Sequence, residues 1–345
     1  MAGALQDRAV TIIGAGIGGL TAAIALAQRG AQLSVHEQAP ELAEVGAGIQ
    51  LSANVVRVLD ALGLGRALGP HALRNTGVHL HDHAGRAVLR MDLAKHRPDA
   101  RFLVIHRARL IQVLVAAART ANVRIHLGSR ISGLPDTGLI IGADGLKSQM
   151  RQVLNGPQVP FFTGQTAWRA IIPDAQAETA TAQVFMGAGQ HLVSYPLAHG
   201  LRNIVAVVER RDWQEEGWSR ADNPENLRNA FASFGGPVQD WLGAVVQTNI
   251  WGLFRHPVAA HWHDDHRVIL GDAAHPTLPF LAQGAGMAIE DAWTLAACLD
   301  AESDQTKALA RYQAIRQPRV TRIVDAANAN ARNYHLGGVK RHAAH

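Results

Sequence analysis

The stretch AVTIIGAGIGGLTAAIALAQRGAQLSVHE, residues 9–37, decides the fold of this chain. It begins with a short apolar run, passes through a glycine-rich turn into an Ala- and Leu-rich segment that ends at Gly30, and closes with QLSVHE. A short apolar run predicts a buried strand, and a glycine after a helical segment is typical of a helix end. The order strand, helix, strand predicts the βαβ unit that opens a parallel sheet.

Three glycines in this stretch, Gly14, Gly16 and Gly19, have the spacing G-x-G-x-x-G. Such glycines allow a tight turn and a close approach of a dinucleotide pyrophosphate, whose charge the helix N-terminus stabilises. Glu37 ends the second strand about 20 residues further on, where an acid accepts hydrogen bonds from ribose hydroxyls. The glycine spacing alone fits any tight strand-to-helix turn, but the complete order favours dinucleotide binding. Because an acid here disfavours a 2′-phosphate, we expect FAD or NAD rather than NADP.

Two later apolar runs also deliver an aspartate. LIIGADGLKSQMR at 139–151 brings Asp144 to a turn shortly before Arg151, and RVILGD at 267–272 ends in Asp272. A simple nicotinamide dehydrogenase needs only one nucleotide fingerprint. Two further carboxylates suit a longer ligand with several hydroxyl donors, such as the ribityl chain of FAD.

In the segment GDAAHPTLPFLAQGAGMAIEDA at 271–292, two prolines prevent a helix from forming in the first part. A helix is expected to begin near Gln283. A helix N-terminus offers unpaired N–H groups and about half a positive charge. Such an end stabilises the anion of a reduced flavin, and Gly284 and Gly286 allow a planar ring to approach.

Composition limits the remaining possibilities. With 345 residues, 48% of them hydrophobic, the chain can bury one or two cores, and its single cysteine, Cys298, excludes an internal disulfide. The first residues run into a strand without a signal peptide, and no apolar run is as long as a membrane span. We therefore expect a cytoplasmic protein with no membrane partner. The net charge of +5 is scattered, which disfavours nucleic acid and suits small anionic substrates.

The middle of the chain is predicted to be sheet. Residues 187–211, GAGQHLVSYPLAHGLRNIVAVVERR, divide into two or three antiparallel strands around a turn at His199 and Gly200. We predict a substrate-binding β-sheet domain of residues 75–100 and 160–266, inserted into a discontinuous nucleotide-binding domain of residues 1–74, 101–159 and 267–345. His191 and Tyr195, four residues apart, lie on one face of a straight strand.

Three ordered motifs resemble those of the FAD-dependent aromatic hydroxylases, the single-component flavoprotein monooxygenases. They are GxGxxG near the start, GADGxxSxxR in the middle and GDAAHPxxPxxAQGxxMAIEDA late in the chain. Further similarity lies in VGAGIQLSANVVRVLDALGLG at 45–65, IHRARL at 105–110, TGQTAWRAIIP at 163–173, HLVSYPL at 191–197, and RYQAIRQPRV and NYHLGG in the tail. The chain is most similar to the branch of salicylate hydroxylase and 3-hydroxybenzoate 6-hydroxylase. This implies an α/β fold: a discontinuous Rossmann-like FAD-binding domain, an inserted β-sheet-rich substrate domain and C-terminal helices.

The resemblance also implies roles for individual residues. Those expected to bind FAD, from its ADP half to its ring, are Gly14, Gly16, Gly19, Glu37, Arg107, Asp144, Arg151, Asp272, Gln283, Gly284 and Gly286. Asp144 and Arg151 would also serve the nicotinamide nucleotide of a visiting NADH or NADPH. Pro279 would lie beside the flavin carbon that reacts with oxygen.

The implied reaction is the hydroxylation of a small phenolic acid with NAD(P)H and dioxygen, through a flavin C4a-hydroperoxide. Ionising the phenol makes its ring more nucleophilic, so a base or proton relay is expected beside the hydroxyl. The resemblance places His191 and Tyr195 at the substrate, which makes them candidate catalytic residues together with Pro279. From the residues alone, a histidine bonded to backbone and a tyrosine packed in the sheet are equally good interpretations.

Two other functions stay open: a flavin-dependent oxidase or dehydrogenase, and a non-catalytic flavin-binding relative. Asp144 and Arg151 favour the hydroxylase, because they are useful mainly where a nicotinamide cofactor visits. No metal is expected, since His79, His81, His83 and the histidines between 261 and 266 fall where the family has variable strand or loop. A monomer and a homodimer are both compatible with the sequence.

One departure from the family is the short stretch ISGLPDTGLI at 131–140, where relatives usually carry a further β-hairpin. A peripheral hairpin can be lost without harm to the fold, but the packing beside the adenine half of FAD is then reduced. We therefore expect weak retention of FAD. Measuring the FAD content after dialysis tests this, and full stoichiometric retention would contradict it.

Overall fold

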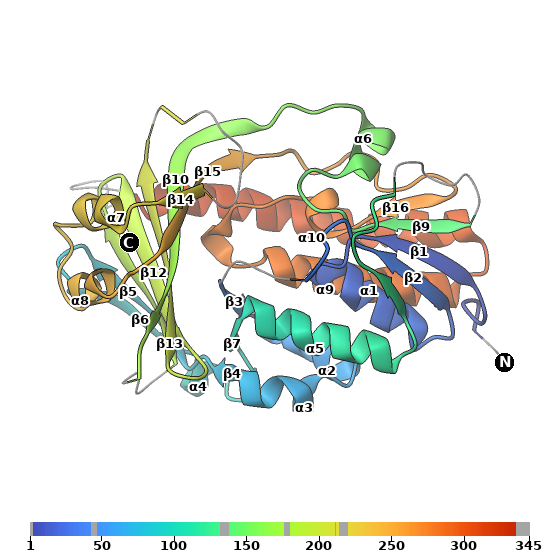
Figure 1. Cartoon of the computed structure of the whole chain (residues 1–345), viewed down its shortest axis with the longest axis horizontal. Helices are drawn as coiled ribbons and strands as arrows, with labels where there is room; N and C mark the ends of the chain where they lie inside the picture. Colours follow the sequence, from blue (N-terminus) through green and yellow to red (C-terminus); the bar gives the residue numbers. More distant parts are fainter. Residues whose placement is uncertain are drawn as a thin grey trace.

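The structure, a computed structural model, describes residues 3–42, 47–131, 138–175, 180–210, 212–213 and 220–335. Figure 1 shows a parallel sheet and a larger mixed sheet toward opposite ends of the long axis of the molecule. Helix α9 (Gly284–Ala301) and the long helix α10 (Gln305–Asn333) follow the last strand of the parallel sheet, and α10 extends toward the large sheet. The molecule therefore has two layered halves that are connected by its C-terminal helices.

The parallel sheet has five strands in the order β16-β9-β1-β2-β8, and every pair in it is parallel. Its strands are β1 (Ala9–Ile13), β2 (Gln32–His36), β8 (Arg124–His126), β9 (Leu139–Gly142) and β16 (Arg267–Ile269). Helix α1 (Ile17–Ala27) makes the crossover between β1 and β2, which confirms the predicted βαβ unit. Because the carboxyl ends of parallel strands meet at one edge, the turns after β1, β9 and β16 lie side by side.

Helix α1 is buried along most of its length, because its Ala, Leu and Ile side chains are apolar on all sides. It packs mainly against α9 and α5. The other helical segments of this half are α2 (Ala53–Ala61), α3 (Gly65–Leu68), η1 (Gly69–His71), α5 (Arg107–Thr120), α6 (Gln149–Asn155), η2 (Gly271–Ala273) and η3 (Pro279–Leu281). Cys298 lies buried in α9, as expected of a packed thiol.

The large sheet has eight strands in the order β14-β15-β10-β13-β12-β11-β5-β6. Only the pair β11 and β5 is parallel, and the other neighbours are antiparallel. The strands are β5 (Gly77–Asp82), β6 (Ala87–Asp92), β10 (Phe161–Pro173), β11 (Thr181–Gly187), β12 (Gln190–Leu197), β13 (Leu201–Glu209), β14 (Arg220–Asp222) and β15 (Thr248–Arg255). Both His199 (φ 66°) and Gly200 (φ 68°) are left-handed in the β12–β13 connection, which confirms the predicted turn.

The two faces of the large sheet have different partners. One face carries Leu192, Ile204 and Phe185, which pack against α7 (Pro224–Ala230) and α8 (Val238–Gly243). The side chains of the alternate positions, His191 and Val193 among them, point to the opposite face, toward the nucleotide-binding half. The sheet thus has a closed core on one side and leaves the other side for a ligand.

A third sheet, in the order β3-β7-β4, lies between the two larger sheets in space (Figure 1). Its strands are β3 (Gly48–Leu51), β4 (Ala72–Arg74) and β7 (Leu103–His106), and the short helix α4 (Leu93–His96) follows β6. The α/β fold with a Rossmann-like parallel sheet, a second β-rich part and C-terminal helices is confirmed. None of the helices in the described ranges is long and apolar enough to cross a membrane.

Candidate active site

A cavity of about 450 Å³ lies between the parallel sheet and the large sheet. Gly16 and Ile17 at the start of α1, Asp272 after β16, and Gly284 at the start of α9 line its nucleotide side. Val193, Val205 and Val207 from β12 and β13 give the opposite wall an apolar surface. The volume lies within the range of about 300–1,000 Å³ that is usual for pockets that hold small molecules or cofactors.

The glycine turn after β1 has the geometry that its spacing predicts. Gly14 has φ of +101°, and a Cβ there would lie 2.3 Å from the carbonyl oxygen of Ala143. A Cβ at Gly19 would lie 1.9 Å from the carbonyl oxygen of Gly14, so only glycine fits at either position. At Gly16, by contrast, a Cβ would meet nothing within 4 Å. Gly14 and Gly19 thus shape the turn, and Gly16 leaves room at its cavity side.

Glu37 lies at the end of β2, next to this turn. Its carboxylate accepts hydrogen bonds from the backbone N–H of Ala15 and of Ala39, both at 2.9 Å. The residue is therefore beside the glycine turn as predicted, although its side chain does not line the cavity.

Asp144 and Arg151 lie at helix α6 and do not line the cavity. Asp144 precedes the helix, and Arg151 is in its first turn. The Asp144 carboxylate accepts hydrogen bonds from the Ser148 hydroxyl at 2.5 Å and from the backbone of Gln149 at 2.8 Å. The buried Arg151 guanidinium donates to the carbonyl oxygens of Ala273 at 3.2 Å and Ala274 at 3.0 Å. It also donates to Gln158 and Pro257. These hydrogen bonds hold the loops that follow β9 and β16, and the expected roles of both residues toward FAD and a nicotinamide nucleotide stay predictions.

Asp272 lines the cavity from the loop after β16, and its side chain is exposed in the open space of the cavity. Desolvation by the protein atoms around the cavity raises the pKa of its carboxyl, and the nearby His275, Arg107 and His256 oppose that rise. Arg107, the first residue of α5, lines the same cavity. An acceptor and a cation therefore lie where the ribityl and nucleotide parts of a flavin are expected.

Helix α9 begins at Gly284, with Gln283 as its N-cap residue, which confirms the predicted helix start. No side chain caps this end, and Gly284 and Ala285 line the cavity, as does Pro279 from η3. Gly286 has a different role, because a Cβ there would lie 2.7 Å from Cγ2 of Val55 in α2. The missing side chain allows α9 to pack closely against α2, and the expectation that Gly286 binds FAD stays a prediction.

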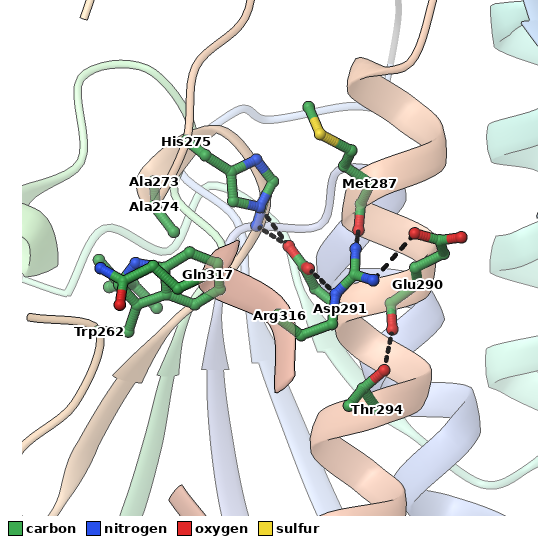
Figure 2. A network of polar contacts seen from close by, with 12 residues as sticks. Trp262, Ala273, Ala274, His275, Met287, Glu290, Asp291, Thr294, Arg316 and Gln317 are labelled. Atoms are coloured by element: carbon green, nitrogen blue, oxygen red, sulfur yellow. Dashed lines mark hydrogen bonds and ion pairs between the residues drawn. The ribbon is translucent and has the colours of Figure 1, made fainter. Parts of the chain in front are cut away.

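A buried ionic network, shown in Figure 2, holds the loop after β16 against α9 and α10. The Asp291 carboxylate of α9 accepts from the backbone N–H of Gly271 at 3.0 Å and pairs with His275 Nε2 at 2.5 Å. Arg316 of α10 donates to Asp291 at 2.7 Å and pairs with Glu290 at 2.9 Å. Burial opposes ionisation of Asp291, but His275 and Arg316 outweigh it and lower the pKa of the carboxyl. The network fixes the backbone that presents Asp272.

His191 and Tyr195 both line the cavity, as their spacing on one strand face predicts. Burial and the neighbouring His335 lower the pKa of His191 well below its ordinary value, so its imidazole is neutral at neutral pH. Burial raises the pKa of Tyr195, and Arg169 only partly opposes this. Tyr195 can therefore donate a hydrogen bond but is not a base at neutral pH, whereas His191 has a lone pair for a proton.

Three residues at the site were not predicted: Arg169 and Tyr334, which line the cavity, and His335, which contacts His191. Arg169 lines the cavity from β10 and its guanidinium lies 4.7 Å from the ring centre of Trp251. Tyr334 lines the cavity just after α10, and Nε2 of His335 lies 2.7 Å from Nδ1 of His191. The stretches TGQTAWRAIIP and NYHLGG contain these residues, but nothing in the sequence distinguishes them from packing residues.

Comparison with known proteins decides the family. A family model described as an FAD binding domain matches residues 7–139 and 136–327. A 3-amino-4-hydroxybenzoate 2-monooxygenase of Streptomyces platensis is 34% identical over 351 residues, which cover 95% of this chain and 88% of that protein. This chain belongs to the FAD-dependent aromatic hydroxylases.

Two other proteins extend the comparison of this hydroxylase. The 3-hydroxybenzoate 6-hydroxylase of Polaromonas naphthalenivorans is 33% identical over 364 residues, covering 97% of this chain and 90% of that protein. The structure of Klebsiella pneumoniae HpxO, solved with FAD and uric acid, has a TM-score of 0.86 at 25% identity, covering 98% of this chain and 91% of that one. The predicted family is confirmed.

The cavity of this hydroxylase fits FAD. Open space beside Gly16, two helix starts without side-chain caps, and the Asp272 carboxylate follow one another along one wall. When bound, FAD supplies electron transfer and activation of dioxygen. In the described ranges, no group of three or more His, Cys, Asp or Glu side chains could hold a metal ion. The stretch expected to lack a hairpin falls largely on residues 132–137, outside the described residues, so weak FAD retention stays a prediction.

Replacing Gly16 with valine is expected to weaken FAD binding without unfolding the hydroxylase. The new side chain has no protein neighbour to displace, but it enters the space where the pyrophosphate is expected. Overpacking costs about 1–3 kcal/mol, or about 5- to 150-fold in the dissociation constant for FAD. Titration of the flavin-free protein with FAD measures it. Gly243→Val, at an exposed site with equal space, is the control, and equal affinities in the two variants would contradict the prediction.

Proposed function

We propose that this protein hydroxylates a small aromatic acid that already carries a phenolic hydroxyl, with NADH or NADPH as reductant and dioxygen as oxidant. The observation that carries the proposal is the composition of one cavity wall. There a base (His191), a hydrogen-bond donor (Tyr195) and a cation (Arg169) surround an apolar face of valines, opposite the residues that fit FAD. The names of the relatives, which are monooxygenases and hydroxylases of hydroxybenzoates, support the same class of substrate.

Each of the three polar groups suits one part of such a substrate. Neutral His191 can take the phenolic proton, which raises the nucleophilicity of the ring. Tyr195, which stays protonated, can donate a hydrogen bond to the oxygen of the substrate. Arg169 can pair with the carboxylate, and its stacking on Trp251 fixes the plane of the guanidinium. Pro279 lies between this wall and the start of α9, where it shapes the space beside the flavin.

We also infer the predicted division of the chain, with residues 75–100 and 160–266 as the substrate-binding domain. All strands of the large sheet lie within these ranges, which supports the division. For the nicotinamide nucleotide, Asp144 and Arg151 contribute by holding loops in place, which their hydrogen bonds support. We propose a cytoplasmic enzyme, monomeric or homodimeric, whose partners are small molecules and not nucleic acid or membrane.

The test of this function begins with the flavin-loaded protein. Hydroxybenzoates and related phenolic acids are screened for stimulated oxidation of NADH or NADPH, with analysis of the products. A hydroxylated product formed in step with nucleotide oxidation supports the proposal. Substrate oxidation without incorporation of oxygen would indicate an oxidase or dehydrogenase instead. Nucleotide oxidation that no aromatic compound accelerates would reject the proposal.

Replacing Arg169 with methionine is expected to raise KM for a hydroxybenzoate about 10- to 150-fold, because a hydrogen bond to a charged group contributes about 1.5–3 kcal/mol. Methionine keeps an apolar stem against Trp251 and removes the charge. The same variant is expected to bind the corresponding phenol without a carboxylate as well as the wild type does. Arg255→Met, at the exposed end of β15, is the control. Equal losses for both ligands would contradict the assignment.

A further inference from the structure

His191 is the first of three side chains that connect the cavity with the surface. Its Nδ1 lies 2.7 Å from Nε2 of His335, and Nδ1 of His335 lies 3.0 Å from Oε1 of Glu209. The three residues come from β12, from the residues after α10, and from the end of β13. The contacts are continuous, and each joins two groups that can bind and release a proton.

Exposure increases along this chain of contacts. His191 is 2% exposed and lines the cavity, and the side chain of His335 is 3% exposed, so neither reaches bulk solvent. The Glu209 side chain is 58% exposed. A proton that leaves the cavity through these groups is therefore released from a carboxylate that is in contact with water.

The hydrogen bonds specify one arrangement of protons. A carboxylate only accepts, so Nδ1 of His335 donates to Glu209. Nε2 of a neutral His335 then accepts, so Nδ1 of His191 donates to it. The nitrogen of His191 that remains for the cavity, Nε2, has a lone pair. With this arrangement of protons, Nε2 of His191 can accept a proton from the substrate. Each N–H of the two histidines then donates toward Glu209.

Gln165 stabilises this arrangement. Its side-chain amide lies 3.2 Å from Nδ1 of His335, and its oxygen is buried without a partner among the described residues. A half-turn of the amide exchanges its nitrogen and oxygen. The oxygen then accepts from the same Nδ1–H that faces Glu209. Gln165 thus holds the ring of His335 in the tautomer that this arrangement of protons requires.

We propose that His335 and Glu209 form a proton relay that connects His191 with solvent. The inference rests on the proposed function, since the proton comes from the phenol of the substrate. The phenolic O–H breaks and its proton binds Nε2 of His191, while the Nδ1 proton of His191 passes to Nε2 of His335. The Nδ1 proton of His335 passes to the Glu209 carboxylate, which exchanges it with water. After hydroxylation, the phenolate oxygen regains a proton by the reverse path, which restores both tautomers.

The relay predicts how fast a bound phenol loses its proton. The probe is a nitro-substituted hydroxybenzoate that absorbs visible light only as the phenolate, bound to the flavin-loaded protein and followed after a rapid rise in pH. In Glu209→Gln and His335→Gln, which keep hydrogen-bonding groups but pass no proton, phenolate formation is expected to slow at least about tenfold. Free imidazole added to His335→Ala is expected to restore the rate, which a purely structural role of His335 does not predict.

The control is Glu225→Gln on α7, because the Glu225 side chain is 60% exposed, close to the value for Glu209. It is expected to match the wild type. Wild-type rates in both Glu209→Gln and His335→Gln, with the probe bound, would overturn the relay and leave the proposed function intact. A wild-type protein that neither binds the probe nor hydroxylates any phenolic acid would overturn the proposed function, and the relay with it, before any variant is compared.

Discussion

Replacing Asp291 with alanine is expected to lower the free energy of unfolding by about 3–5 kcal/mol, the usual cost of breaking a buried ion pair from one side. The Asp291 carboxylate is fully buried and accepts from Gly271, His275 and Arg316. Without this carboxylate, the Arg316 guanidinium, whose side chain is only 4% exposed, has one negative partner fewer. The loop after β16 also loses its hydrogen bonds to α9. Urea unfolding of the flavin-free protein measures the change.

The matched control is Asp99→Ala, which removes a carboxylate from an exposed position. It is expected to change the free energy of unfolding by less than about 0.5 kcal/mol. A loss in Asp291→Ala no larger than that of the control would show that the network is not important for stability.

The contribution of Asp291 is also expected to depend on pH. Its pKa is lower in the folded protein than in the unfolded chain, where a free Asp has a pKa of about 3.9. The unfolded state therefore binds a proton first as the pH falls, and acid stabilises it relative to the fold. The difference between wild type and Asp291→Ala should be constant from neutral pH to about pH 5, and should shrink below about pH 4.

Replacing His191 with asparagine is expected to lower the rate of hydroxylation by about 10²- to 10⁴-fold, the usual contribution of a general base. The asparagine amide can keep a hydrogen bond to His335, but it cannot take the phenolic proton. Nucleotide oxidation should continue and yield hydrogen peroxide in place of product. The ratio of hydroxylated product to NAD(P)H consumed measures this loss.

The dependence of kcat/KM on pH shows whether His191 acts as a base or only packs in the sheet. Burial and His335 lower the pKa of His191, so its neutral form persists below pH 6.5. The acid limb of kcat/KM for the wild type is therefore expected below pH 6.5, and it should disappear in His191→Asn. His199→Asn is the control, because asparagine tolerates the left-handed φ of 66° in that exposed turn. An unchanged rate and profile in His191→Asn would reject His191 as the base.

The nucleotide-binding half could be predicted from sequence because its characteristic residues are required by contacts within a few residues of the chain. Gly14 and Gly19 are glycines for steric reasons that act within one turn, and the βαβ order follows from short apolar runs. The face shared by His191 and Tyr195 was predictable for the same reason, since alternation along a strand is local.

The partners of these residues could not be predicted, because they come from distant parts of the chain. His335 lies beside His191 because α10 ends next to the large sheet. Arg316 contacts Asp291 because α10 packs on α9. The close approach of Gly286 to Val55 was not predictable for the same reason, because Val55 lies more than two hundred residues earlier in the chain.

The adjacency of β1, β9 and β16 has a consequence for folding. Gly142 pairs with both Ile13 and Ile269, so the edge that meets the nucleotide is assembled from three remote segments. Pairings of this kind close long loops and are reached late and slowly. Strands β10 to β15, which form most of the large sheet, lie between β9 and β16 in the chain, so the pairing of β16 with β9 closes a long loop. We therefore expect FAD to bind only those molecules in which β16 has joined the parallel sheet.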